Sequence, residues 1–174
     1  SAQRICEVLK EESSIENPQN PIMSVPDGSI DFNNVSFKYH KEAEKCALTD
    51  IDLHIKSGET IGIIGGTGSS KSSLIQLISR LYDVNEGEVK VGGNNVKDYD
   101  IETLRNAVSV VLQKNILFSG TIKDNLRWGN MNATDEELVR VCKLAQADEF
   151  ISALPDGYDT HIEQGGTNVS GGQK

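Results

Sequence analysis

Three observations predict an α/β fold for this chain. Alternating, β-rich stretches come first, at residues 30–37, 48–55 and 60–64. A glycine-rich loop then leads into a helix with one apolar face, and from about residue 120 the pattern becomes helical. We therefore expect an N-terminal antiparallel β-subdomain, a mainly parallel core sheet and a C-terminal α-helical subdomain.

The N-terminal residues are expected to lie outside this fold. Residues 2–12 place apolar side chains among charged ones, which predicts the last turns of a helix. Residues 13–26 contain three of the four prolines and no apolar period, which is typical of a linker. The sequence thus predicts three segments: a helix end with its linker (1–25), a core (26–118) and a helical subdomain (119–174).

Apolar periodicity and capping residues predict the remaining elements. Leu74, Leu77, Ile78 and Leu81 share one face of a helix over 71–81. Thr134 with Glu137 forms a capping box that opens a helix running to Ala145. The other expected elements are a strand at 88–91, a helix at 101–107, a buried strand at 108–112 and a short helix at 148–154.

Composition excludes several classes of protein. The 174 residues include 17 Lys and Arg against 26 Asp and Glu, a net charge of −9, which repels polyanions, so we expect no nucleic-acid partner. No apolar stretch approaches the roughly 20 residues of a spanning helix. The three cysteines lie far apart with no CxxC pair, which favours reduced thiols over a disulfide framework or a zinc site.

The glycine-rich loop, Gly65-Gly66-Thr67-Gly68-Ser69-Ser70-Lys71-Ser72, matches the phosphate-binding pattern G-x-x-x-x-G-K-[ST] except that Ser70 replaces the second glycine. In that pattern backbone N–H groups surround a β-phosphate, Lys71 reaches the β- and γ-oxygens, and the Ser72 hydroxyl binds Mg²⁺. The alternative is a glycine-rich turn with a surface lysine. The position between a predicted strand and a helix favours the phosphate loop.

A second motif makes the prediction specific. Ser170-Gly171-Gly172-Gln173, after Val169, resembles the LSGGQ signature of ATP-binding-cassette (ABC) proteins. At a helix start, this stretch would offer a hydroxyl and bare amides to an anion. The resemblance covers residues 30–174 and implies a P-loop NTPase (RecA-like) core, with ATP and Mg²⁺ as cofactors.

The resemblance also implies site residues. Tyr39 resembles the aromatic residue that stacks on adenine, and Gln113 resembles the Q-loop glutamine that contacts Mg²⁺ and the attacking water. Lys71 and Gln113 are the candidate catalytic residues, and Ser72 and Gln113 the candidate metal ligands. The full set expected to bind nucleotide is Tyr39, Gly65, Gly66, Thr67, Gly68, Ser69, Ser70, Lys71, Ser72, Ser73, Gln113, Ser170, Gly171, Gly172 and Gln173.

Several stretches, such as Leu117-Phe118-Ser119-Gly120-Thr121-Ile122, are similar to multidrug and lipid exporters. That similarity implies a transmembrane domain in the same parent chain, a second nucleotide-binding domain as partner and a place on the cytoplasmic face of the membrane. DNA-repair cassettes are excluded, because no heptads separate Lys71 from Ser170. The family's Walker B strand and switch histidine follow its signature, so the stretch ending at Lys174 is expected to be a fragment that is inactive alone.

Departures from the family pattern leave alternatives open. Ser70 replaces a glycine, and Gln164 and Gly165 stand where exporters commonly carry Glu and Arg. These differences resemble the degenerate, largely non-hydrolytic half of a heterodimeric transporter. A regulatory subunit that holds ATP without hydrolysing it and a kinase-like P-loop enzyme are further alternatives, although a kinase would leave the signature without a role.

Overall fold

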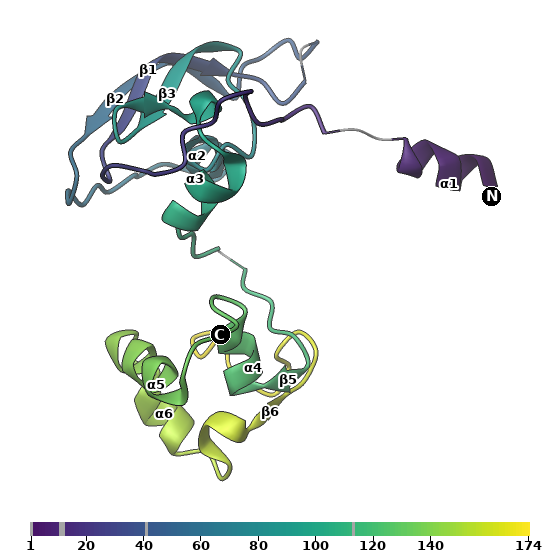
Figure 1. Cartoon of the computed structure of the whole chain (residues 1–174), viewed down its shortest axis with the longest axis vertical. Helices are drawn as coiled ribbons and strands as arrows, with labels where there is room; N and C mark the ends of the chain where they lie inside the picture. Colours follow the sequence, from purple (N-terminus) through teal and green to yellow (C-terminus); the bar gives the residue numbers. More distant parts are fainter. Residues whose placement is uncertain (1, 11–12, 41, 113) are drawn as a thin grey trace. The chain divides into compact units, whose positions relative to one another are not determined.

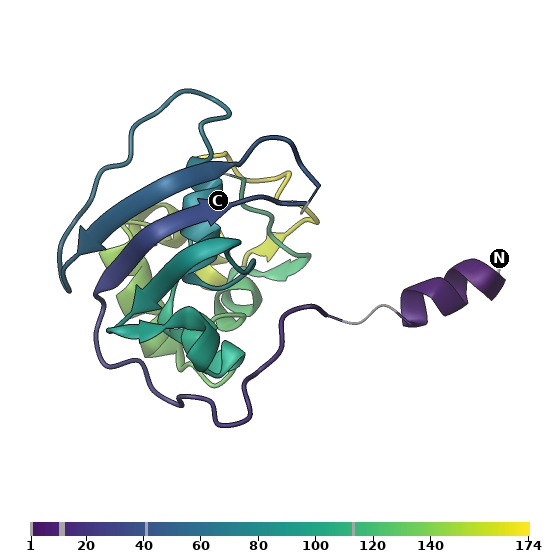
Figure 2. The same ribbon diagram turned by 90° about the horizontal axis from the view of Figure 1, so that it is seen from above.

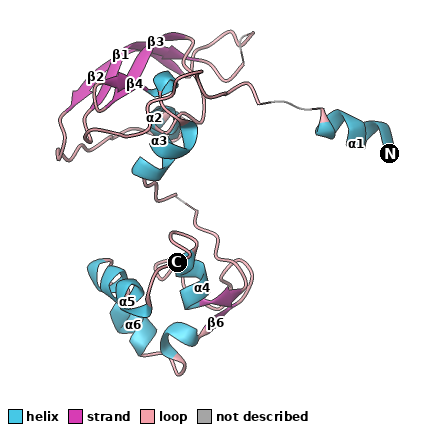
Figure 3. Ribbon diagram, viewed as in Figure 1, coloured by secondary structure: helices cyan, strands magenta, loops and turns pink. Residues whose placement is uncertain are grey.

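The computed structural model describes residues 2–10, 13–40, 42–112 and 114–174. The chain divides into two compact units, Ser1–Val110 and Val111–Lys174. The elements of the first unit are α1 (Ala2–Leu9), β1 (Ile30–Phe37), β2 (Leu48–Ile55), α2 (Lys71–Ile78), β3 (Glu86–Val91), β4 (Asn94–Asn95), the 3₁₀ helix η1 (Val96–Asp98) and α3 (Ile101–Ala107) (Figures 1 and 3). Those of the second are β5 (Gly120–Thr121), α4 (Ile122–Arg127), α5 (Asp135–Leu144), α6 (Asp148–Ser152), the 3₁₀ helix η2 (Gly157–Asp159) and β6 (His161–Ile162).

The first unit contains a four-stranded antiparallel sheet in the order β2-β1-β3-β4. Figure 2 shows its strands from above. Near Asn34, which has a φ of 48°, the pairing of β1 shifts in register against both neighbouring strands, β2 and β3. Gly87 lies opposite with a φ of 76°, and a Cβ there would clash with the carbonyl oxygens of Asn33 and Asn34. Glycine at this position therefore lets β3 approach the irregular part of β1.

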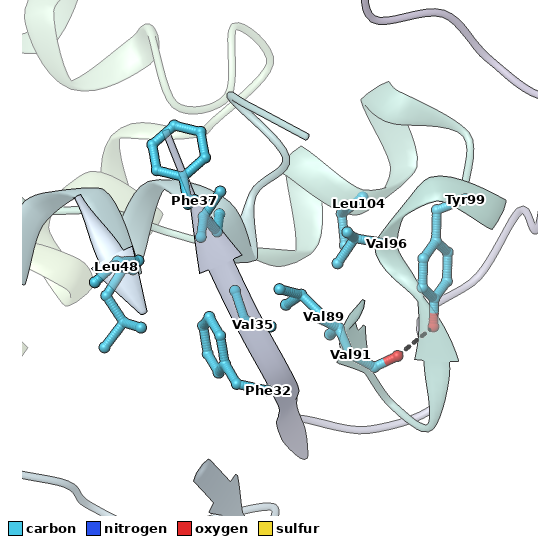
Figure 4. Close-up of a cluster of buried hydrophobic side chains, with 11 residues drawn as sticks. Phe32, Val35, Phe37, Leu48, Val89, Val91, Val96, Tyr99 and Leu104 are labelled. Carbon is cyan, nitrogen blue, oxygen red and sulfur yellow. Dashed lines mark hydrogen bonds between the residues drawn. The ribbon is translucent and has the colours of Figure 1, made fainter. Parts of the chain in front are cut away.

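Helices α2 and α3 cover one face of this sheet (Figure 1). Leu74 and Leu77 of α2 and Leu104 of α3 belong to the same buried cluster as the strand residues. Figure 4 shows this cluster, in which the Tyr99 hydroxyl donates to the carbonyl oxygen of Val91 at 2.7 Å. The antiparallel β-subdomain and its helices thus have the arrangement that the apolar pattern predicts.

Residues 13–26, the linker, contact the rest of the first unit over part of their length. The side-chain amide of Asn17 donates to Asp100 Oδ1 at 2.7 Å, and its oxygen accepts from the Ile101 N–H at 2.8 Å. Ile22 forms a parallel bridge with Tyr99. Residues 13–26 form no helix or strand, as expected, but these contacts attach them to the start of α3.

Two of the expected strands are absent from the described residues. Neither 60–64 nor the described residues 108–112 form a ladder, and Ile64 and Val111 are 99% and 89% exposed. The ladders of the described residues are antiparallel, so the expectation of a mainly parallel sheet is wrong for this part of the chain. A buried parallel strand needs neighbours along both edges and cover on both faces, and these segments have neither here.

The second unit is a small helical subdomain with a two-stranded antiparallel sheet, β5 and β6. Its core contains Ile122, Cys142, Ile151 and Ile162. Helix α5 begins at a capping box in which Thr134 accepts from the Glu137 N–H and Glu137 accepts from the Thr134 N–H, as the sequence predicts.

Some predicted boundaries differ. Helix α2 ends at Ile78 rather than at residue 81, because Arg80 adopts a φ of 49° and the Leu81 N–H donates to Gln76 O, a closure that stops the helix. Helix α6 ends at Ser152 rather than at residue 154. Helix α1 ends at Leu9, and residues 11–12 of the helix end that the sequence predicts lie outside the described residues. The cysteines are free: Cys142 is buried, while Cys6 and Cys46 are exposed.

Candidate functional site

The candidate phosphate loop runs from Gly65 into the first turn of α2. Gly68 has a φ of 82°, and Ser70, the N-cap of α2, has a φ of 61°. The Ser70 side chain makes no capping hydrogen bond, so it does not compete for the N–H groups of the first turn. Those groups and the positive end of the helix dipole favour an anion at this position.

Lys71 folds back over the loop. Its Nζ donates to the carbonyl oxygens of Gly65 at 2.7 Å and Gly66 at 2.8 Å, and to Ser69 Oγ at 3.1 Å. These contacts hold the ammonium group against the loop, where it can meet the negative charge of a phosphate.

Ser72 is exposed in the first turn of α2, directly after Lys71. A hydroxyl there suits Mg²⁺, which in nucleotide sites takes few protein ligands and several phosphate and water oxygens. The described residues contain no group of three or more His, Cys, Asp or Glu that could hold a metal by themselves. The other predicted metal ligand, Gln113, lies outside the described residues.

Tyr39 lies just beyond β1, 47% exposed. Its hydroxyl and that of Ser73 share a hydrogen bond of 2.7 Å. Its ring centroid lies 4.9 Å from that of Phe37 and 5.1 Å from that of Tyr82, at interplanar angles of 72° and 89°. The structure thus brings Tyr39 next to the first turn of α2, although 34 residues separate it from Ser73.

The signature motif belongs to the second unit. Ser170 to Lys174 are exposed and form a turn in which the N–H groups of Gln173 and Lys174 donate to Ser170 O. The Gln173 side chain accepts from the Ser170 N–H at 2.8 Å. The sequence predicts a helix start here, and the structure shows only this single turn.

Sequence reasoning missed two features of the site. The hydrogen bond between Tyr39 and Ser73 joins residues on separate elements, and the Tyr82 ring reaches Tyr39 from beyond the end of α2. No spacing in the sequence signals either contact, because both depend on how β1 packs over α2.

A comparison with known protein families shows to which family the chain belongs. Residues 48–174 match the sequence profile of the ABC transporter family. The chain belongs to this family. The resemblance to ABC proteins is therefore confirmed, and membership in the ABC transporter family implies ATP binding.

Individual proteins with similar sequences support the same family assignment. Over 172 residues the chain is 44% identical to proteins from Staphylococcus aureus strains NCTC 8325 and Mu50, which are named, provisionally, as multidrug export ATP-binding/permease proteins. These matches cover 98% of this chain but 29% of each relative, so the chain spans less than a third of their length.

A solved structure of a bacterial Atm1-family ABC exporter with ATP bound is also similar. Its TM-score is 0.91 at 29% sequence identity, covering 99% of this chain and 30% of that one. The α/β fold class with a P-loop NTPase core is confirmed, and the chain resembles the part of that ABC exporter that it covers. Within the described residues, no helix has both the length and the apolar character that spanning a bilayer requires.

Proposed function

We propose that this chain binds Mg-ATP as the nucleotide-binding domain of an ABC exporter that couples ATP binding and hydrolysis to export across a membrane. The observation that carries the proposal is the candidate phosphate loop, in which Nζ of Lys71, the first residue of α2, donates to the carbonyl oxygens of Gly65 and Gly66. The similarity to multidrug export ATP-binding/permease proteins supports it.

Each site residue has a proposed role. Lys71 neutralises the β- and γ-phosphate oxygens, Ser72 contributes a hydroxyl to Mg²⁺, and Tyr39 supports the base. Gln113 orients Mg²⁺ and the attacking water. Magnesium supplies charge neutralisation on the phosphate oxygens when it is bound.

The signature acts on a second nucleotide. We propose that Ser170 to Gln173 face ATP held by a second nucleotide-binding domain, whose own signature faces Lys71 and Ser72. A transmembrane domain in the same parent chain then places this domain on the cytoplasmic face of the membrane. Exposure of the whole motif supports this role, because a partner can reach it.

The alternative, a degenerate and largely non-hydrolytic half, gains no support from the comparisons, which match proteins named for multidrug export, ATP binding and permease function and an ABC exporter with ATP bound. The departures at Ser70, Gln164 and Gly165 are the features that suggest it. We propose that hydrolysis occurs in the parent transporter, and that the 174-residue chain alone binds nucleotide without steady turnover.

The test is ATP binding by the purified chain and its Lys71→Ala variant, measured by NMR titration. Loss of a charge-assisted contact worth ~1.5–3 kcal/mol should weaken ATP binding roughly 10- to 100-fold. Lys56→Ala, which removes a positive charge after β2, is the control and should change affinity little. Equal affinities for the chain and Lys71→Ala would show that the loop does not hold phosphate, and steady ATP turnover lost in Lys71→Ala would contradict binding without hydrolysis.

A further inference from the structure

We propose that Asn85 is a positioning residue for base recognition: its side-chain oxygen holds the Lys38 N–H and so fixes the backbone from which the Tyr39 ring projects. This inference rests on the proposed function, because it assumes that Tyr39 supports the base of a bound nucleotide. It adds to the site a residue that none of the sequence motifs contains.

Tyr39 lies beyond the paired part of β1. The pairing of this strand with β2 ends at Phe37, and its pairing with β3 ends at Ser36. Tyr39 is 47% exposed, and an open hollow of about 750 Å³ lies beside it. The strand ladders therefore stop short of Tyr39, and a contact at Lys38 decides where its ring projects.

Asn85 provides that contact. It directly precedes β3, and its Oδ1 accepts from the Lys38 N–H at 2.6 Å. Its own N–H donates to Ser36 O at 3.1 Å. The side-chain oxygen thus takes the part that a backbone carbonyl plays in a regular ladder, and it extends the support of β1 towards Tyr39.

The segment that carries Asn85 is itself anchored. Arg80 is 5% exposed, and its guanidinium donates to Asp83 Oδ1 at 3.0 Å and to Lys97 O at 3.3 Å. Arg105 of α3 donates to Arg80 O at 3.0 Å. These contacts fix the chain between α2 and β3, so Asn85 offers its oxygen from a held position.

The same segment also contacts the Tyr39 ring. The Tyr82 ring centroid lies 5.1 Å from that of Tyr39 at an interplanar angle of 89°. Such edge contacts are favourable over centroid distances of about 4.5–7 Å, so the ring contact alone does not fix the backbone. The hydrogen bond from Lys38 to Asn85 supplies the missing constraint.

Loss of this bond should affect the base and not the phosphates. Without the Asn85 oxygen, the Lys38 N–H can pair with water, and the backbone at Tyr39 samples other orientations. A ligand that needs one orientation then binds more weakly, in proportion to the fraction of molecules that have it. Asn85 lies after the end of α2, whereas Lys71 begins this helix, so the phosphate loop keeps its contacts.

The experiment compares Asn85→Ala and Asn85→Asp by NMR titration of the 174-residue chain with Mg-ATP and with inorganic tripolyphosphate, which has no base. Asn85→Ala should bind ATP about 2- to 10-fold more weakly, the value of roughly one hydrogen bond, with tripolyphosphate affinity unchanged. Asn85→Asp keeps an oxygen acceptor. Its ratio of ATP affinity to tripolyphosphate affinity should equal that of the unsubstituted chain, because the added charge acts on both ligands.

Two further measurements separate positioning from a general loss of structure. In a Tyr39→Ala background, Asn85→Ala should cause no further loss of ATP affinity, because the ring that Asn85 positions is absent. Hydrogen exchange of the Lys38 amide should be faster in Asn85→Ala than in the unsubstituted chain or in Asn85→Asp.

Asn95→Ala is the matched control. The Asn95 side chain also accepts from a lysine N–H, that of Lys97 at 3.0 Å, at the start of η1. The variant therefore removes the same atoms and the same kind of hydrogen bond from a turn that does not carry Tyr39. It should leave ATP affinity unchanged.

Unchanged ATP affinity in Asn85→Ala, equal losses for ATP and tripolyphosphate, or a further loss in the Tyr39→Ala background would overturn this inference alone. An Asn95→Ala variant that weakens ATP binding as much as Asn85→Ala, or an Asn85→Asp variant that restores nothing, would do the same. Tyr39→Ala without effect on ATP affinity would overturn the role of Tyr39 at the base. Failure of the unsubstituted chain to bind ATP would overturn the proposed function as a whole.

Discussion

Ser70 offers the sharpest test of the backbone of the phosphate loop. It has a φ of 61° and a ψ of 21°, in the left-handed region that favours glycine, and its side chain makes no capping hydrogen bond. A residue with a Cβ loses roughly 1–2 kcal/mol in this conformation. Ser70→Gly should relieve that strain, and nothing in the capping of α2 is lost with the side chain.

The strain relieved in the folded state is partly offset, because glycine loses about 0.5–1 kcal/mol more conformational entropy than other residues when the chain folds. We therefore expect Ser70→Gly to raise the free energy of unfolding of the first unit by about 0.5–1 kcal/mol. With an m-value of about 1–3 kcal/mol/M, the urea midpoint should rise by about 0.2–1 M. The assay is a urea titration followed by NMR peak intensities of β1 residues, so that the second unit does not contribute to the reading.

Ser69→Gly is the matched control, because it deletes the same atoms one residue earlier, at a position without a positive φ. There glycine adds unfolded-state freedom without relieving strain, and it also removes the Oγ that accepts from Lys71 Nζ, so the midpoint should fall. If the urea midpoint falls in both variants, the argument that the Ser70 backbone is strained is refuted. If it rises in both, loss of the serine side chain, and not relief of backbone strain, raises the stability.

Two further predictions concern the first unit. Leu104→Ala removes a side chain that is 0% exposed and should lower the free energy of unfolding by about 2–5 kcal/mol, whereas Leu9→Ala, at 79% exposure, should change it by less than about 0.5 kcal/mol, as measured by urea unfolding; similar losses would contradict the assigned core. His54 donates to Asp31 at 2.7 Å, which raises the pKa of His54 above its ordinary 6.5. The free energy of unfolding that this pair contributes is therefore fully present below pH 6.5, the unfolded-state pKa, and is lost as the pH rises through the raised pKa of the folded state. The urea midpoints of the unsubstituted chain and of His54→Gln should accordingly differ at about pH 5.5 and become equal at about pH 8.5.

Local patterns in the sequence determined much of the chain. Strands β1 and β2 and helix α3 begin and end where the alternation and apolar spacing predict, and the capping box at Thr134 opens α5. The phosphate loop and the signature were also readable, because glycine, lysine and hydroxyl residues at fixed spacing have few other uses. Each of these features depends on neighbours within a few residues along the chain.

Tertiary packing decided the rest. Periodicity marks 60–64 and 108–112 as strands, yet strand formation needs pairing partners, and these residues have none in the described part of the chain. Tyr39 was singled out only by its resemblance to an aromatic residue of the family, and its hydrogen bond to Ser73 became visible only once β1 had been placed over α2. Asn17 likewise contacts Asp100 across 83 residues of sequence. Spacing along the chain carries no record of such contacts, since folding creates the proximity on which they depend.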